Sequence, residues 1–186
     1  MKRSGSEKVC LVSLGVLLSG FSGMVLHGAV TSPQTQNERR ANAAYNDETS
    51  IRTAAETSMS QVDLGKVAEQ KAQSPEVKKF AELMVEEHSK ITTQLKTLGL
   101  NEHINLPTSV GRRDADTHRQ LATESGATFD RGYTQQVVNE LQRQIAEFKQ
   151  GASATTRPAL KEFFERTQPT LEAELQQAKQ LMVHSR

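Results

Sequence analysis

The stretch SPEVKKFAELMVEEHSKITTQLKTLG, residues Ser74–Gly99, indicates the fold class. It begins with three helix-initiation signals, which are Ser as an N-cap, Pro at the first helical position and Glu in the first turn. Apolar residues then recur every three or four positions, and Gly99 is placed to end the helix. This stripe consists of Val77, Ala81, Met84, His88, Ile91, Leu95 and Leu98. We therefore predict a long amphipathic helix with a histidine in the middle of its apolar face.

Three further segments repeat this pattern, over residues 48–73, 125–151 and from about 156 to the end of the chain. A shorter helix is predicted over residues 112–124, within the connection between the second and third long helices. Aromatic residues make up only 4% of the chain and tryptophan is absent, which suits helices packed through aliphatic ridges. The sequence therefore predicts an all-α fold, a ferritin-like four-helix bundle with a short extra helix in the middle crossover.

The N-terminus indicates export. A short basic segment precedes the apolar run VCLVSLGVLLSGFSGMVLHGAV, residues 9–30. A clean small-x-small cleavage site is missing at the end of this run, because His27 lies two residues before Ala29. Residues 1–29 are therefore either a signal peptide or an N-terminal membrane anchor, and their Gly and Ser content favours cleavage. We predict a periplasmic or membrane-associated protein, with possible membrane attachment through residues 9–30.

The rest of the chain divides into a linker and one domain. Residues 30–47 are polar without an apolar period, which predicts a flexible linker, and residues 48–185 form the bundle. Beyond residue 29 the chain has a net charge of −1 and lacks cysteine, since Cys10 is the only one. Near-neutral charge argues against nucleic-acid binding, and the missing thiols exclude disulfides in this part.

Two predicted helices carry an ionisable residue within the apolar stripe: His88 in the second and Glu174 in the fourth. Gln61 flanks the stripe of the first helix, and Asp130 lies where that of the third begins. A buried carboxylate or imidazole without a partner costs on the order of several kcal/mol, so these groups must meet one another, a metal ion or water. We interpret the four residues as a structural polar core, in which His88 and Glu174 pair.

The alternative is a site for iron, manganese or zinc built from His88, Glu174 and Glu87. Di-iron bundles use Glu-x-x-His pairs, whose spacing puts both ligands on one helix face. Here Glu87 is adjacent to His88, and adjacent helical residues point about 100° apart. No second histidine lies on a predicted bundle face. The residues therefore favour a protein without a cofactor or a catalytic site, and the metal site stays an open alternative.

Four ordered motifs carry a family resemblance. They are VDLGKVAEQKAQSPEVKKFAELMVEEHSK (62–90), LPT (106–108), SGATFDRGY (125–133) and QPTLEAELQQAKQL (168–181). These motifs resemble the bacterial exported family known as domain of unknown function 4142. The resemblance implies a ferritin-like bundle of the cell envelope, over about residues 50–183, and no established reaction.

This chain departs from the family pattern at the inward positions. The family commonly has Glu at the position of Gln61, Asp at that of Glu87, and His at those of Leu141 and Glu174. Only His88 is a histidine here, which favours the structural interpretation.

Three functions remain open. The leading one is an exported, non-catalytic protein with a structural or binding role and an unknown envelope partner. The second is a metal-binding or redox bundle. The third is a helical adaptor, whose partner docks on an exposed apolar strip within the poorly amphipathic segment 112–124.

Overall fold

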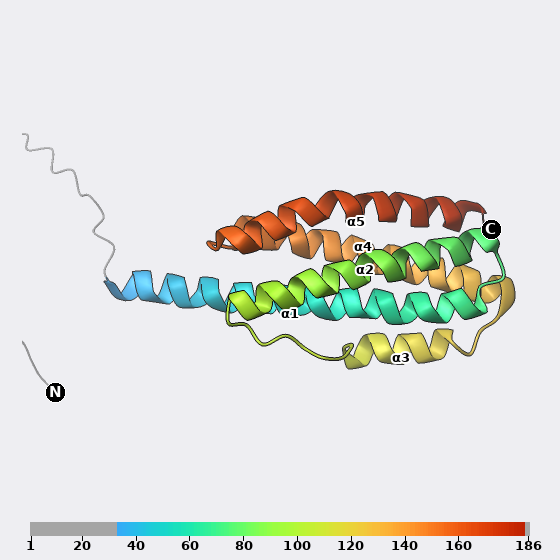
Figure 1. The fold of residues 1–186 in the computed structure, drawn as a ribbon, viewed down its shortest axis with the longest axis horizontal. Coiled ribbons are helices and arrows are strands. Elements are labelled where there is room, and N and C mark those ends of the chain that lie inside the picture. The colour runs from blue at the N-terminus through green and yellow to red at the C-terminus, as the bar shows by residue number, and fades with distance from the viewer. Residues whose placement is uncertain (1–32, 185–186) are drawn as a thin grey trace, which may run out of the picture. The chain divides into compact units, whose positions relative to one another are not determined.

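The computed structural model describes residues 33–184, which form five helices and no strand (Figure 1). The helices are α1 (Pro33–Lys71), α2 (Pro75–Asn101), α3 (Arg112–Leu121), α4 (Gly126–Ala154) and α5 (Pro158–His184). The four long helices pack as a bundle, and the short α3 lies beside it in the crossover. The predicted fold class is therefore confirmed.

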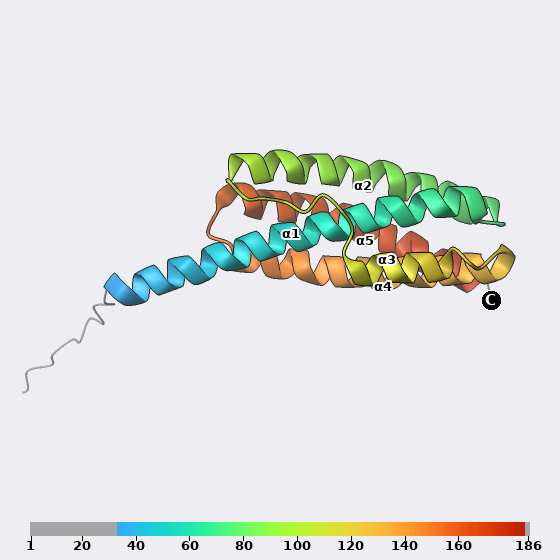
Figure 2. The same cartoon turned by 90° about the horizontal axis from the view of Figure 1, so that it is seen from below.

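The path of the chain makes neighbouring long helices antiparallel. Helices α1 and α2 form one hairpin, and α4 and α5 form the other (Figures 1 and 2). Helix α3 runs back along the bundle, so that α4 starts at the same end as α2. One long crossover of this kind is typical of ferritin-like bundles.

The core forms where the predicted apolar stripes meet. The inward residues of the predicted third helix are all buried: Phe129, Tyr133, Val137, Leu141, Ile145 and Phe148. At one end of the core, the rings of Phe148, Phe163 and Phe164 pack with centroids 5.1–5.8 Å apart. Edge-to-face packing at this distance is the arrangement that aromatic rings favour.

Gly99, which we expected to end the second long helix, and Gly151, the last residue of the predicted third one, both lie inside helices. A Cβ on Gly151 would come 2.7 Å from the Phe164 ring, and one on Gly99 would come 2.9 Å from Leu106 Cγ. Both glycines therefore allow a close approach between segments. Helix α2 instead ends in a Schellman motif with His103 in the left-handed conformation (φ 57°) and a hydrogen bond from Ile104 N to Gly99 O.

The beginning of α1 differs from the sequence prediction. We expected residues 30–47 to form a flexible linker, but the helix begins at Pro33. Proline at the first helical position and the Ala, Gln, Glu and Arg residues after it allow the packed helix to extend backwards without an apolar stripe. Asp47 is already buried and pairs with Arg157 Nε at 3.3 Å.

The predicted signal peptide or anchor, residues 1–29, lies outside the described residues. Among the helices between residues 33 and 184, none combines the length and the apolar character that a membrane span requires.

Candidate functional site

His88 and Glu174 meet inside the bundle. His88 Nε2 lies 3.2 Å from Glu174 Oε2, and the side chains are 0% and 3% exposed. Helices α2 and α5 run antiparallel here, which brings the middle of one apolar stripe opposite the middle of the other. His88 Nδ1 and Glu174 Oε1 have no hydrogen-bond partner among the described residues. The pair thus keeps one free nitrogen and one free oxygen in the interior.

Four more side chains of the described region have buried polar atoms without a hydrogen-bond partner: Gln61, Tyr133, Gln144 and Glu147. Gln61 has no partner for its amide nitrogen or oxygen, and neither does the hydroxyl group of Tyr133. Burial raises the pKa of Tyr133 far above its ordinary value, and the negative charges of Glu140, Glu69 and Glu174 add to that shift. The phenol is therefore neutral at physiological pH.

A second polar cluster, which the sequence did not predict, joins α3 to the bundle. His118 Nε2 lies 3.1 Å from Ser60 Oγ and 3.7 Å from Glu140 Oε1, and Gln136 Nε2 donates to Glu140 Oε1 at 2.7 Å. His118 lies on the short middle helix, as the sequence predicted, but its side chain is only 8% exposed and contacts the bundle, which the sequence did not indicate. Glu140 lies seven residues, or two helical turns, after the inward-facing Tyr133, and this spacing was the signal in the sequence that Glu140 is buried.

Asp130 connects α4 to the turn between α1 and α2. Its carboxylate oxygens accept hydrogen bonds from the backbone N–H groups of Gln73 (3.0 Å) and Ser74 (2.8 Å). Ser74 in turn is the N-cap of α2 and accepts from Val77 N, as the sequence predicted. The buried carboxylate of Asp130 is therefore occupied in holding a turn.

The third candidate metal ligand does not join the pair. The Glu87 side chain is 28% exposed, and its Oε1 lies 2.8 Å from Lys90 Nζ on the same helix. Within residues 33–184, no group of three or more His, Cys, Asp or Glu side chains is arranged to hold a metal ion. His88 and Glu174 are the two proposed ligands that the structure brings together.

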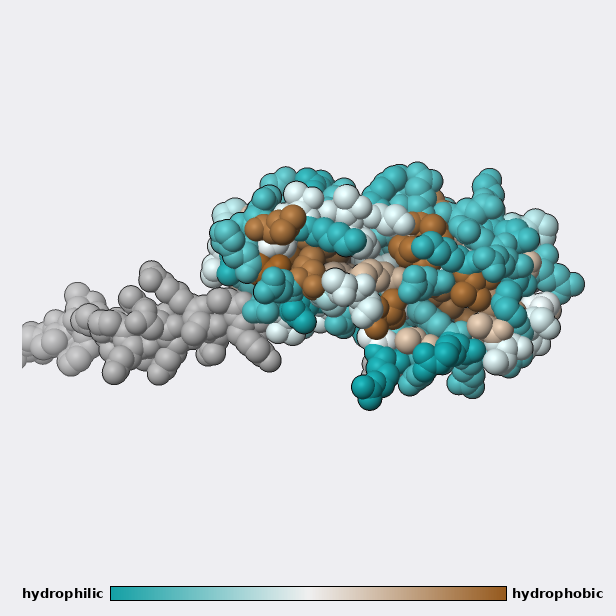
Figure 3. Space-filling model, turned by 60° about the horizontal axis from the view of Figure 1, so that its bottom comes forward, coloured by the Kyte–Doolittle hydropathy of each residue, from teal (hydrophilic) through white to brown (hydrophobic). Residues whose placement is uncertain are grey.

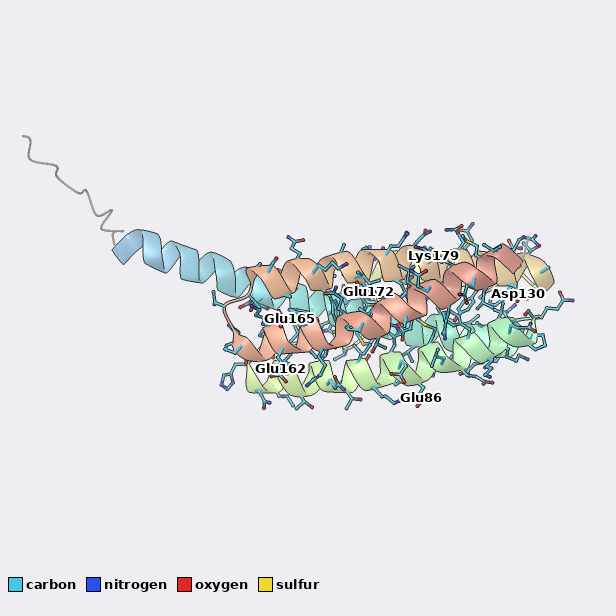
Figure 4. All side chains as sticks on the ribbon, turned by 90° about the horizontal axis from the view of Figure 1, so that it is seen from above. Glu86, Asp130, Glu162, Glu165, Glu172 and Lys179 are labelled. Carbon is cyan, nitrogen blue, oxygen red and sulfur yellow. The ribbon has the colours of Figure 1, made fainter. Side chains whose placement is uncertain are left out.

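An open groove lies between α2 and α5, and sequence reasoning missed it. The two helices diverge towards the end of the bundle at which Asp130 lies (Figure 4). The groove has a volume of about 1210 Å³, and the turn before α2 and the first turns of α4 also line it. Its apolar side chains are Val77, Phe80, Leu83, Ala127 and Leu181.

The surface around α3 does not provide the apolar strip expected on residues 112–124. The large apolar residue of α3, Leu121, is buried, and so is His118. On this side of the molecule, hydrophilic residues cover most of the surface and hydrophobic ones emerge in separate patches (Figure 3).

Comparison with known proteins gives a family and a fold. A family model described as "Domain of unknown function (DUF4142)" matches residues 31–181. A similar solved structure is "CopM in the Cu(II)-bound form", with a TM-score of 0.60 and 21% identity, over 74% of this chain and 96% of that one. At this identity the likeness concerns the fold. No curated protein matches the sequence.

Proposed function

This chain belongs to the family described as Domain of unknown function (DUF4142), and we propose that it is an exported, non-catalytic binding protein of the bacterial cell envelope. The observation that carries the binding role is the groove between α2 and α5. A concave site with mostly apolar walls and a few polar groups is the usual form of a small-molecule site. The basic and apolar N-terminal sequence supports export.

The buried ionisable groups support a role without catalysis. Glu140 accepts from Gln136, Glu174 contacts His88, and Asp130 is bonded to two backbone N–H groups. Of these carboxylates only Asp130 lines the groove, and its two hydrogen bonds occupy both oxygens. These groups stabilise helix contacts and leave the groove without a free buried acid or base.

We expect an uncharged apolar fluorophore, N-phenyl-1-naphthylamine, to bind in the groove with one-to-one stoichiometry. Ala127→Trp fills the groove from an exposed position of α4 and should weaken this binding at least tenfold. Ala173→Trp, at an exposed position of α5 outside the groove, is the matched control and should bind like the unchanged protein. Fluorescence titration measures both, and equal binding by both variants would contradict a groove site.

The proposal that the protein is exported has a separate test. The chain expressed from its own first residue in a bacterium should leave the cytosol, and its intact mass shows whether about residues 1–29 have been removed. Full-length protein confined to the cytosol would contradict export.

Copper binding is a second candidate function. The unpaired His88 Nδ1 and Glu174 Oε1 favour it, and the similar bundle named above was solved with Cu(II). Imidazole and carboxylate groups are suitable copper ligands, and Gln61 offers an unpaired amide oxygen. Two ionisable ligands underfill the usual coordination sphere, so this function ranks below the first.

Cu(II) titration of the protein by calorimetry separates the two functions. Our leading proposal predicts that His88→Gln, which keeps a hydrogen-bond donor for Glu174, leaves Cu(II) binding unchanged. Stoichiometric Cu(II) that is lost in His88→Gln but kept in His103→Gln, at an exposed histidine, would establish the second function instead.

A further inference from the structure

The groove has apolar side chains on both α2 and α5, and on α5 they are accompanied by Gln177 and Gln180. Val77, Phe80 and Leu83 come from α2, and Leu181 comes from α5. At this end α5 leans towards α4 and away from α2 (Figure 4), and the groove lies between α2 and α5. The walls therefore suit an apolar chain that lies along the groove.

The acidic groups of the groove are already engaged within the protein. Asp130 accepts from two backbone N–H groups, and Glu76 Oε2 accepts from Ser74 Oγ at 2.5 Å. The hydrogen bond from Ser74 lowers the pKa of the Glu76 carboxyl, which therefore stays ionised and turned towards the N-cap. Both carboxylates therefore already accept hydrogen bonds from donors within the protein.

The basic groups of the groove are not engaged in this way. Lys79 on α2 and Arg131 on α4 are exposed, and neither forms an ion pair within the described part of the chain. Arg131 makes a long hydrogen bond to Thr128 Oγ1, at 3.4 Å. The groove thus offers two cations, on separate helices, next to its apolar walls.

From this arrangement we propose that the groove binds a monomeric single-chain amphiphile with an anionic head, of the fatty-acid class. The tail lies against the α2 and α5 walls, and the head lies between Lys79 and Arg131. The inference rests on the proposed function, because it names the ligand class of the same groove.

Other occupants fit these walls less well. An extended peptide would bring backbone N–H and C=O groups against the apolar side chains, and the amides of Gln73, Gln177 and Gln180 would satisfy only some of these groups. A wholly apolar ligand would gain nothing from the two exposed cations. An anionic amphiphile satisfies the walls and the charges together.

The test compares two probes with the same tail, dodecanoate and dodecanol, as competitors of the fluorophore on the protein recovered from cells. We expect dodecanoate to compete about tenfold better than dodecanol, because only dodecanoate has a charged head. The double variant Lys79→Gln/Arg131→Gln should reduce competition by dodecanoate to the level of dodecanol. Competition by dodecanol should stay unchanged. Lys96→Gln/Arg112→Gln removes the same charges from exposed positions outside the groove and should change neither.

The possible outcomes are distinct. Fluorophore binding with equal competition by the two probes would overturn the anionic ligand and leave the groove as a binding site. Absence of any fluorophore binding would overturn the proposed function as well. A dimer in light scattering that Ala127→Trp abolishes would show that a second copy fills the groove, which would also overturn the amphiphile.

Discussion

Replacement of either His88 or Glu174 by leucine is expected to lower the free energy of unfolding by about 2–4 kcal/mol. Each change leaves the other side chain buried without its partner, since the two side chains are almost fully inaccessible to solvent. The double replacement should lower the free energy of unfolding much less, because two leucines fit the surrounding apolar stripes and neither carries a desolvation cost. The coupling between the two sites should therefore be about 2 kcal/mol or more.

Urea unfolding followed by circular dichroism measures this cycle. The exposed pair formed by Lys90 and Glu86 on α2 is the matched control, because its atoms are close (2.6 Å) but both side chains are more than half exposed. Its coupling should stay below about 1 kcal/mol. Additive effects of the His88 and Glu174 replacements would show that the buried contact does not stabilise the fold.

The sequence was sufficient for the bundle because each long helix has its own periodic apolar stripe. Since His88 and Glu174 lie on two such stripes, their positions inside the bundle follow from the same periodicity. The groove does not follow from it. Periodicity says which face of α2 and α5 is buried, but the angle at which two helices cross depends on side-chain packing along their whole length.

Contacts between distant segments explain the remaining differences. Glycines at the positions of Gly99 and Gly151 are typical of helix ends. Here the two residues lie within helices, where Leu106 and the Phe164 ring approach them from other segments and leave no room for a side chain. His118 lies on a short helix with a single large apolar residue, so its contact with Ser60 and Glu140 depends on how the crossover packs. Local patterns carry no information about such approaches.

Replacement of Asp130 is the second change for which we expect a large loss of stability. We expect Asp130→Ala to lower the free energy of unfolding by about 2–4 kcal/mol, because the N–H groups of Gln73 and Ser74 lose a charged acceptor in a partly buried place. Asp130→Asn keeps one acceptor oxygen and should lose about half as much. Asp63→Ala, at an exposed position of α1, is the control and should change stability by less than about 0.5 kcal/mol.

Hydrogen exchange shows where the Asp130 replacement acts. In Asp130→Ala the amides of Gln73 and Ser74 should exchange faster, while those at the middle of α2, near His88, stay protected in proportion to global stability. Because the same turn lines the groove, fluorophore affinity should also fall in this variant and stay unchanged in Asp63→Ala. Equal stability and equal exchange in Asp130→Ala and Asp63→Ala would mean that the carboxylate does not hold the turn, and that packing of Val77 and Phe80 alone positions the start of α2.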